Sequence, residues 1–551
     1  MESRKGEDQL EWLKHSDLRQ LLASDGIPTP WFSAYKSIDA DDQHTTWFSA
    51  LVPPGQVSSL LAHDSGWDVH IGDGGPAIFS YSEGDSERFV YTPYGNDSGI
   101  EPLVLHRHFH DIRPDSLELA QEFRLYHNLY LEPSKNRYIA IDNNGDESDA
   151  ARFGPGFMEV RTDLLVNFCA AKQVSLAIYI DSARYAIQPL AELGSEEIRE
   201  SDHGPYHCAD AVVVSESFPF KEKYSTLGRL LGKKYVAPRA MPRDNEPEEG
   251  RFQEFIIGTD ESGNLIRHSC NPEHLGNYFG KNPDAPHYLT PVYFRPEVLA
   301  KYYAEPAKYT VEDGGLRCGG LWHLRMDNDH SDYIVVWLGD LGQDLHQQER
   351  DYWLSFNISP AGRKISRTNF KRAFLAEFAD PSRPDLVFKS NYADFCVSFK
   401  SLMGWDFFLP LHPDDEHLLT ALHLPMKDNQ AEFDSQLIAL TKIIVDSLNE
   451  KAISKDVATI AKDDKSITKL EKFFSSIGAS GYEGHIEFLR VLQNLRSVGA
   501  AHRKGSNYDK VVADLQLKDE GHQLVFGKLL NAANEFIQYL QKLFLPEENE
   551  V

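Results

Sequence analysis

Short runs of alternating or β-branched apolar residues recur through the first 430 residues of the chain. Such runs are typical of β-strands when turn residues separate them. We therefore expect strands at 88–92, 103–105, 137–141, 175–180, 211–215, 255–257 and 333–338. Asn, Asp, Ser and Gly cluster at 143–146 and at 260–263, and these clusters predict hairpin turns.

Helical periodicity is less frequent in this part of the chain and appears at 115–129 and 296–303. Because helices and strands do not alternate regularly as in βαβ units, the pattern favours an α+β fold. The Pro- and acid-rich segment 237–250 is the best linker candidate, although its composition also fits one long surface loop. We therefore expect α+β domains at 1–245 and 246–425, each a candidate sensor or regulatory domain.

After Pro425 the apolar residues recur at helical spacing. The first helix is marked by Phe433, Leu437, Leu440, Ile444 and Leu448. A second predicted helix contains 467–474, Gly478–Gly481 breaks it, a third runs over 485–495, and a last one spans 524–545. Since the connections between these amphipathic helices are mostly short, we expect an antiparallel helical bundle at 426–551.

The charge of the chain is uneven. The net charge of −28 argues against a nucleic-acid-binding surface over the whole protein, because phosphate contacts need Lys and Arg. Residues 431–551, however, hold 15 basic and 18 acidic residues, a net of only −3. The acidic surplus therefore lies mainly in the first 430 residues. It either keeps that part off nucleic acid or is simply a solvated surface.

Other features of the composition limit the class of protein. The five cysteines are scattered and form no CxxC pair, which indicates neither a disulfide framework nor a zinc site. No run of 18 apolar residues predicts a membrane span, and the charged first residues do not resemble a signal peptide. We therefore expect a cytoplasmic protein that needs no metal or other cofactor and has no membrane partner.

The segment 492–508 joins an amphipathic helix to a polar loop and contains Arg496 and His502, with five residues between them. Cleavage of RNA by its own 2′-hydroxyl needs a base with a pKa near 7, and histidine is the natural one. It also needs a fixed positive charge for the phosphorane that develops, and arginine suits that geometry. These two residue types can carry out the reaction without a metal ion.

This arrangement resembles the HEPN superfamily, whose signature is an Arg, four to six residues and a His late in a helical bundle. The resemblance implies a metal-independent endoribonuclease that dimerises to line one cleft with two Arg/His pairs. Arg496 would then hold the scissile phosphate, and His502 would act on the 2′-hydroxyl to leave a cyclic phosphate. HEPN modules with large partner domains are frequent in bacterial antiviral (anti-phage) and stress-response systems, which implies a toxin-like effector here.

The residues around the motif bear on RNA binding. Arg503 and Lys504 supply positive charge for an RNA backbone, and Asn507 and Tyr508 can hydrogen-bond to a base or stack on it. Ser497 departs from the family pattern, in which Asn, Asp or His often follows the Arg. We expect it to hydrogen-bond to RNA, since a serine cannot act as an acid at neutral pH.

The helical geometry of the motif raises a further question. On an ideal helix, six residues leave the side chains of Arg496 and His502 about 120° apart. Gly499 lies between them and weakens the helix there, so a bend would bring the two side chains to one cleft.

Two other interpretations stay open: an adaptor without catalytic activity, and an enzyme in the N-terminal region whose catalytic residues the sequence does not reveal. In the first, the bundle is catalytically inactive and dimerises as an adaptor, while the acidic region binds a partner protein. In the nuclease interpretation, the same region would instead receive a trigger ligand or protein. Separately, His106, His108 and His110 would share one face of a strand as a metal patch, but a half-exposed strand explains the pattern more simply.

Overall fold

The computed structural model describes residues 6–62, 67, 75–83, 86–96, 98–217, 223–240, 252–455, 457–461, 463–497 and 520–545. The chain forms two compact units, Met1–Pro247 and Glu248–Val551. The boundary between them falls inside the Pro- and acid-rich segment 237–250.

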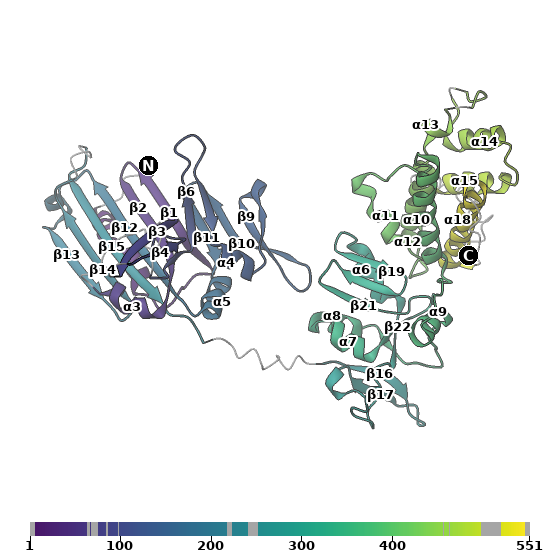
Figure 1. Cartoon of the computed structure of the whole chain (residues 1–551), viewed down its shortest axis with the longest axis horizontal. Coiled ribbons are helices and arrows are strands. Elements are labelled where there is room, and N and C mark those ends of the chain that lie inside the picture. The colour runs from purple at the N-terminus through teal and green to yellow at the C-terminus, as the bar shows by residue number, and fades with distance from the viewer. Residues whose placement is uncertain are drawn as a thin grey trace. The chain divides into compact units, whose positions relative to one another are not determined.

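The first unit is built on one antiparallel sheet of 11 strands (Figure 1). Ten of them follow the order β13-β14-β15-β12-β2-β1-β11-β10-β9-β8, and β5 pairs with β2. The bounds are β1 (Trp31–Ala40), β2 (Gln43–Val52), β5 (Glu101–Pro102), β8 (Tyr130–Glu132), β9 (Arg137–Ile141), β10 (Glu147–Gly154), β11 (Phe157–Arg161), β12 (Ser175–Ala186), β13 (Ile198–His203), β14 (His207–Val214) and β15 (Thr226–Val236).

Helices cover both faces of the sheet at β15. The helices of this unit are α1 (Gly6–Leu13), α2 (Ser16–Ala23), α3 (Pro54–Leu61), α4 (Gln121–Tyr126) and α5 (Thr162–Lys172). A Cβ at Gly228 would lie 2.1 Å from the carbonyl oxygen of Leu13, so the glycine lets α1 approach the strand. On the opposite face, Lys233 donates a hydrogen bond to the carbonyl of Ala62, just after α3. This double cover explains why β12 and β15 are buried almost throughout instead of alternating.

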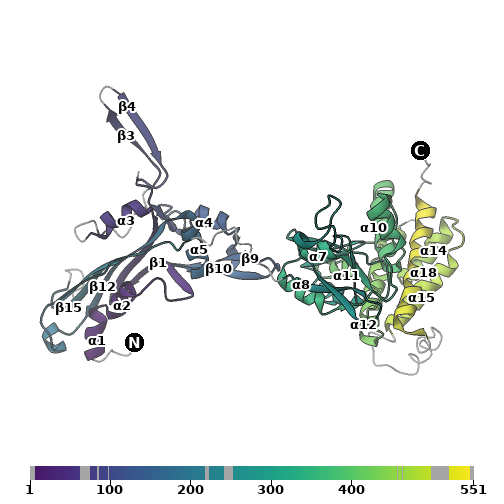
Figure 2. The ribbon, with the colours of Figure 1, turned by 90° about the horizontal axis from the view of Figure 1, so that it is seen from below.

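Two hairpins lie outside the sheet: β3 (Ala77–Glu83) with β4 (Ser86–Thr92), and β6 (Val104–Arg107) with β7 (Ser116–Leu119). The β3–β4 hairpin projects away from the sheet (Figure 2). Its register places Ile78 opposite Tyr91 on one face and Phe79 opposite Val90 on the other. Ile78 is 70% exposed and Tyr91 65% exposed. The hairpin therefore presents apolar side chains to solvent on both of its faces.

The second unit begins with small antiparallel sheets and short helices. The sheets are β16 (Glu254–Thr259) with β17 (Leu265–Ser269), then β22 (Ile334–Trp337), β18 (Pro291–Phe294) and β23 (Asn357–Ile358), and then β19 (Tyr309–Glu312), β20 (Gly315–Cys318) and β21 (Trp322–Arg325). The helices are α6 (Ala300–Ala304), α7 (Leu338–Asp344), α8 (Gln347–Leu354) and α9 (Arg367–Phe370). Trp353 is fully buried against Phe294 and anchors this core.

The rest of the second unit is helical. Its helices are α10 (Pro384–Met403), α11 (His417–Ala421), α12 (Gln430–Thr441), α13 (Glu450–Ile453), α14 (Ser466–Ser476), α15 (Glu483–Leu495) and α18 (His522–Phe544), and α12 continues into a π turn over Lys442–Asp446. One apolar core joins α10 and α12 to α14, α15 and α18. The helical part therefore takes its core from residues on both sides of Pro425.

The directions of the helices differ in part from the predicted antiparallel bundle. The short connection from α14 to α15 does give an antiparallel pair, in which Arg490 contacts Glu471. The prediction is wrong for α12 and α18, because the beginnings of both helices meet: His522 contacts Asp428 and Gln430. These contacts at the two N-terminal ends indicate that α18 runs in the same direction as α12.

A buried ion pair joins the mixed and helical parts of the second unit. Arg383 donates to both carboxylate oxygens of Asp385, and Asp385 also accepts a hydrogen bond from the backbone N–H of Leu424. Burial alone would raise the pKa of Asp385, but the Arg383 guanidinium lowers that pKa to about 2. The carboxylate therefore stays charged and holds α10 against the chain that leads into α12.

The α+β fold class with a helical C-terminal region is confirmed. The predicted strands all overlap observed ones, and both predicted hairpin turns connect paired strands. The helix expected at 115–129 is wrong: Ser116–Leu119 forms β7, and only Gln121–Tyr126 is helical. Because Leu119 and Phe123 are both fully buried, their spacing mimics one helical face across two different elements.

Candidate functional site

The C-terminal end of α15 is the part of the predicted site that the structure describes. Four apolar residues at a spacing of three, Ile486, Leu489, Leu492 and Leu495, are each no more than 3% exposed and fix this helix on the bundle core. Arg496 follows Leu495 directly and leaves the core, with 31% of its side chain exposed. The guanidinium therefore sits on a rigid helix end at the protein surface.

Asp446 is the partner of Arg496. It ends the π turn that follows α12, and its Oδ2 accepts a hydrogen bond from Nη1 of Arg496. Both side chains are partly exposed, and pairs of this kind contribute only roughly 0–1 kcal/mol to stability. The contact therefore serves mainly to orient the guanidinium, whose Nε and Nη2 hydrogens bond to none of the described residues.

The remaining predicted site residues divide into two groups. Ser497 is exposed, and its hydroxyl donates to the carbonyl oxygen of Asn494 at 3.0 Å, so it caps its own helix end. The other five lie outside the described residues: His502, Arg503, Lys504, Asn507 and Tyr508. Of the predicted site, the structure thus brings Arg496 and Ser497 together and adds Asp446.

The two described histidines of the neighbouring helices do not lie beside Arg496. His522 bonds to Asp428, at the opposite end of α12 from Asp446, and these two aspartates are 18 positions apart in the chain, about 27 Å along a helix. His485 lies 11 residues before Arg496 on α15, about 16 Å along the helix, where burial against α18 lowers its pKa.

Asp446 and a charged cavity in the second unit were both missed by sequence reasoning. The cavity has a volume of about 590 Å³, and Asp340 and Asp344 of α7 line it together with Tyr288, Arg325 and Trp337. Burial raises the pKa of both carboxyl groups, while Arg325 opposes this change. The four-residue spacing of the two acids after the buried strand β22 was the available signal.

The three histidines near residue 108 also have a structural explanation. His106 and His108 both contact Asp115 across the β6–β7 hairpin, at 3.4 and 2.8 Å. His110 lies beyond the end of β6 in the left-handed region, with φ 56°. Among the described residues, no group of three or more His, Cys, Asp or Glu side chains is placed to hold a metal ion.

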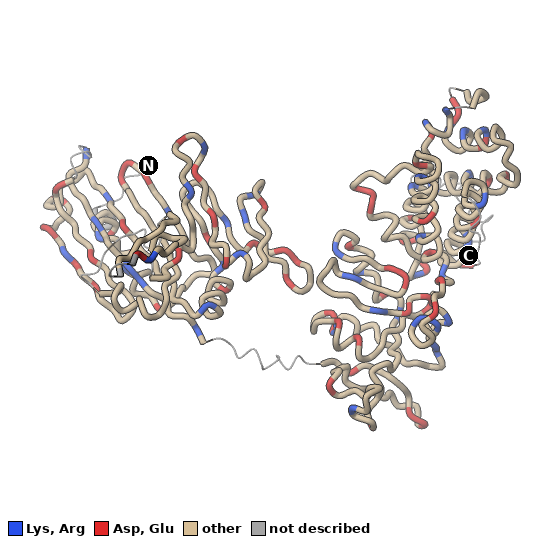
Figure 3. The backbone as a smooth tube through the Cα atoms, in the orientation of Figure 1, with Lys and Arg blue, Asp and Glu red and all other residues tan. Residues whose placement is uncertain are grey.

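Neither the charge distribution nor the comparison with known proteins assigns a function to this site. Acidic and basic residues are interspersed along the described parts of both units (Figure 3). None of the described helices is both long and apolar enough to span a membrane. Comparisons with known proteins find no matching family model and no similar curated protein or solved structure.

Proposed function

We propose that this protein is a metal-independent endoribonuclease whose site lies at the end of α15, with Arg496 and His502 as the catalytic pair. The observation that carries the proposal is the placement of Arg496. It directly follows a buried helix residue, its side chain is partly exposed, and Asp446 orients it through a single nitrogen. The segment that contains His502 follows at once.

The chemistry divides between the two residues. The Nε and Nη2 hydrogens of Arg496 would bind two oxygens of the scissile phosphate, because a guanidinium matches that spacing and Asp446 occupies only Nη1. His502 would take the proton of the 2′-hydroxyl. The 2′-oxygen then attacks phosphorus, the 5′-oxygen leaves and takes up a proton, and a 2′,3′-cyclic phosphate remains. Arg503, Lys504, Asn507 and Tyr508 would bind the RNA backbone and bases, with Ser497 at the rim.

The biological role belongs to the same proposal. By analogy with other HEPN modules joined to large domains, the protein would act in the cytoplasm as a homodimeric, toxin-like effector of antiviral or stress defence. The remaining parts of the chain would receive a trigger ligand or protein. The division into two compact units supports such a separation of sensing and cutting.

A second function is favoured by a different observation. The Arg496–Asp446 contact also resembles an ordinary surface ion pair, and the Ser497 hydroxyl is bound to its own helix. In this alternative the helical part is an inactive dimerisation module, and the protein is an adaptor that binds partner proteins through its acidic region. The exposed apolar hairpin β3–β4 would suit such a role.

The test is an RNA-cleavage assay in the presence of EDTA on the full-length wild type and on Arg496→Ala, His502→Ala and Arg490→Ala. Arg490 is the matched control, because it lies on the same helix and pairs with Glu471 as Arg496 pairs with Asp446. We expect cleavage by the wild type and by Arg490→Ala. Loss of either catalytic group should lower the rate by at least 100-fold, the usual size of a general-base or charge-stabilising contribution.

Two results would count against the nuclease. Cleavage that persists unchanged in His502→Ala would remove the catalytic assignment. The absence of cleavage, together with host growth that neither the wild type nor Arg496→Ala slows on expression, would favour the adaptor.

A further inference from the structure

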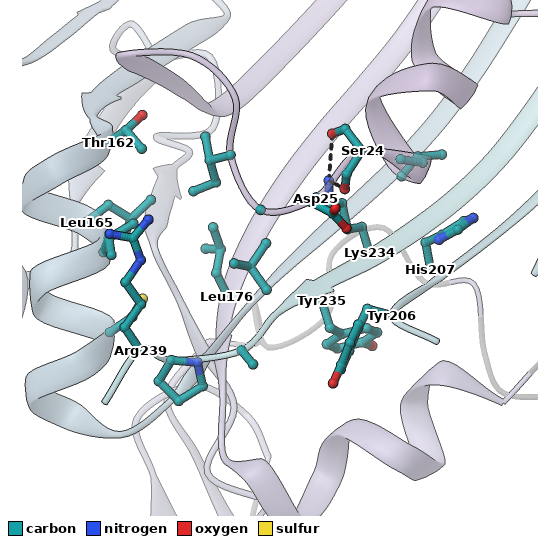
Figure 4. Close-up of a pocket in the computed structure, with 18 of the residues that line it drawn as sticks. Ser24, Asp25, Thr162, Leu165, Leu176, Tyr206, His207, Lys234, Tyr235 and Arg239 are labelled. Atoms are coloured by element: carbon teal, nitrogen blue, oxygen red, sulfur yellow. Dashed lines mark hydrogen bonds between the residues drawn. The ribbon is translucent and has the colours of Figure 1, made fainter. Parts of the chain in front are cut away.

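A cavity of about 360 Å³ opens in the first unit at one end of the large sheet. It lies where β12 begins and β15 ends, between the chain that follows α2 and the first turns of α5 (Figure 4). This volume falls within the range of about 300–1,000 Å³ that is usual for small-ligand sites. Its position is determined entirely by elements of the first unit, so it is independent of the site on α15.

One wall of the cavity is apolar. Leu165 and Val166 of α5 line it together with Leu176 of β12 and Val236 of β15. Cys169 also lines this wall, but burial raises the pKa of its thiol to about 12, so it stays protonated and unreactive. The wall thus offers contact to an apolar body and no covalent chemistry.

Two of the buried polar side chains around the cavity, Lys234 and Tyr235, already have partners. The ammonium group of Lys234 donates to the carbonyls of Leu21 and Ser24 and to the Ser24 hydroxyl, which caps the end of α2. The hydroxyl of Tyr235 is hydrogen-bonded to that of Tyr179. The three hydrogens of the Lys234 ammonium therefore already have acceptors, and none is left to bind a ligand.

Arg239 differs from them because it is exposed, and none of the described residues accepts a hydrogen bond from its guanidinium. Figure 4 shows the guanidinium beside Leu165, across the cavity from Lys234 and Asp25. Since Asp25 lies near the Lys234 ammonium, Arg239 is the charge that remains. The 56% exposed ring of Tyr206 borders the opening.

We propose that this cavity binds a small organic monoanion with an apolar body. The anionic group pairs with Arg239, and the body lies on the wall of Leu165, Leu176 and Val236. A polyphosphate is disfavoured because it would need several free cations, and Arg239 is the one that the described lining provides. The inference does not rest on the ribonuclease activity.

The test uses 1-anilinonaphthalene-8-sulfonate, a fluorescent anion with an aromatic body, titrated against the full-length protein. N-phenyl-1-naphthylamine, which has the same rings and no charge, is the matched neutral probe. We expect saturable binding of the anion that Arg239→Gln weakens about tenfold, the loss of one charge-assisted contact, with no change for the neutral probe. Octanoate should displace the anion at a clearly lower concentration than octanol or acetate does.

Three further variants locate the site. Arg113→Gln, which removes another exposed arginine that pairs with none of the residues described in this unit, should leave the affinity unchanged. Val166→Phe, which fills the cavity, should abolish binding, and Tyr91→Ser on the β3–β4 hairpin should not affect it. An affinity that Arg239→Gln leaves unchanged, equal displacement by octanol or acetate, or loss of binding in Tyr91→Ser would overturn the proposal.

Discussion

His15 connects α1 to α2 in the left-handed region and is fully buried. Its Nε2 lies 3.1 Å from the Ser182 hydroxyl on β12. Burial lowers the pKa of its imidazole to about 3, and the nearby Arg184 acts in the same direction. The folded protein therefore keeps this ring neutral at pH values where the unfolded chain protonates it.

This shift sets the sign of a pH dependence. Between about pH 6.5 and pH 3 the unfolded state binds one more proton at His15, so the free energy of unfolding falls as the pH falls. From pH 6.5 to pH 5.0 the loss is about 2 kcal/mol. Asparagine tolerates the left-handed backbone at this position. In His15→Asn, urea denaturation at pH 6.5 and pH 5.0 should therefore show that this contribution to the fall in the free energy of unfolding is absent. An unchanged difference between the two pH values would contradict the assignment.

The sequence could indicate that Arg496 leaves the helical core, but it could not indicate which residue pairs with Arg496. The exposure of Arg496 follows from the apolar spacing that ends at Leu495, so it was predictable. Asp446 is 50 residues earlier in the chain, and nothing in its neighbourhood marks it as the partner of Arg496. The cavity near Arg239 likewise combines four distant segments, whose meeting depends on strand order.

At the scale of elements, the stability of the helical part depends on the buried aromatic side chains of α10. Phe395 is fully buried and contacts Phe399, Phe407 and Phe408, whereas Val397 on the same helix is 72% exposed. We expect Phe395→Ala to lower the free energy of unfolding by about 3–5 kcal/mol.

Val397→Ala is the control for this substitution and should change the stability by less than about 0.5 kcal/mol. Denaturant titration of both variants measures the difference. Equal effects would mean that α10 is not part of the helical core.

The helices and the large sheet differ in how far local patterns predict them. The C-terminal helices each bury a stripe that repeats within the helix itself, so their positions could be predicted. The order of the strands could not, since β2 pairs with β12 more than 120 residues later and β1 with β11. These pairings carry no local signal, and the double cover of β12 removes even the alternation that would mark its faces.

At the scale of the whole molecule, the two compact units should unfold separately. Each has its own apolar core, and the boundary at Pro247 lies in a segment poor in apolar residues. Calorimetry should therefore resolve two transitions. Phe395→Ala should lower the midpoint of one of them, and His15→Asn should change the pH dependence of the other. A single transition that both substitutions move would contradict this division.

Hydrogen exchange should distinguish the β3–β4 hairpin from the buried strands of the first unit. Among the described residues no third strand pairs with these two, and an isolated hairpin is marginally stable in water, so its amide hydrogens should exchange with deuterium far faster than those of β12. A partner that covers the apolar faces would slow exchange over 77–92 and leave the buried strands unchanged. The chain thus contains its own reporter, which would reveal by mass spectrometry that a complex has formed before the partner is identified.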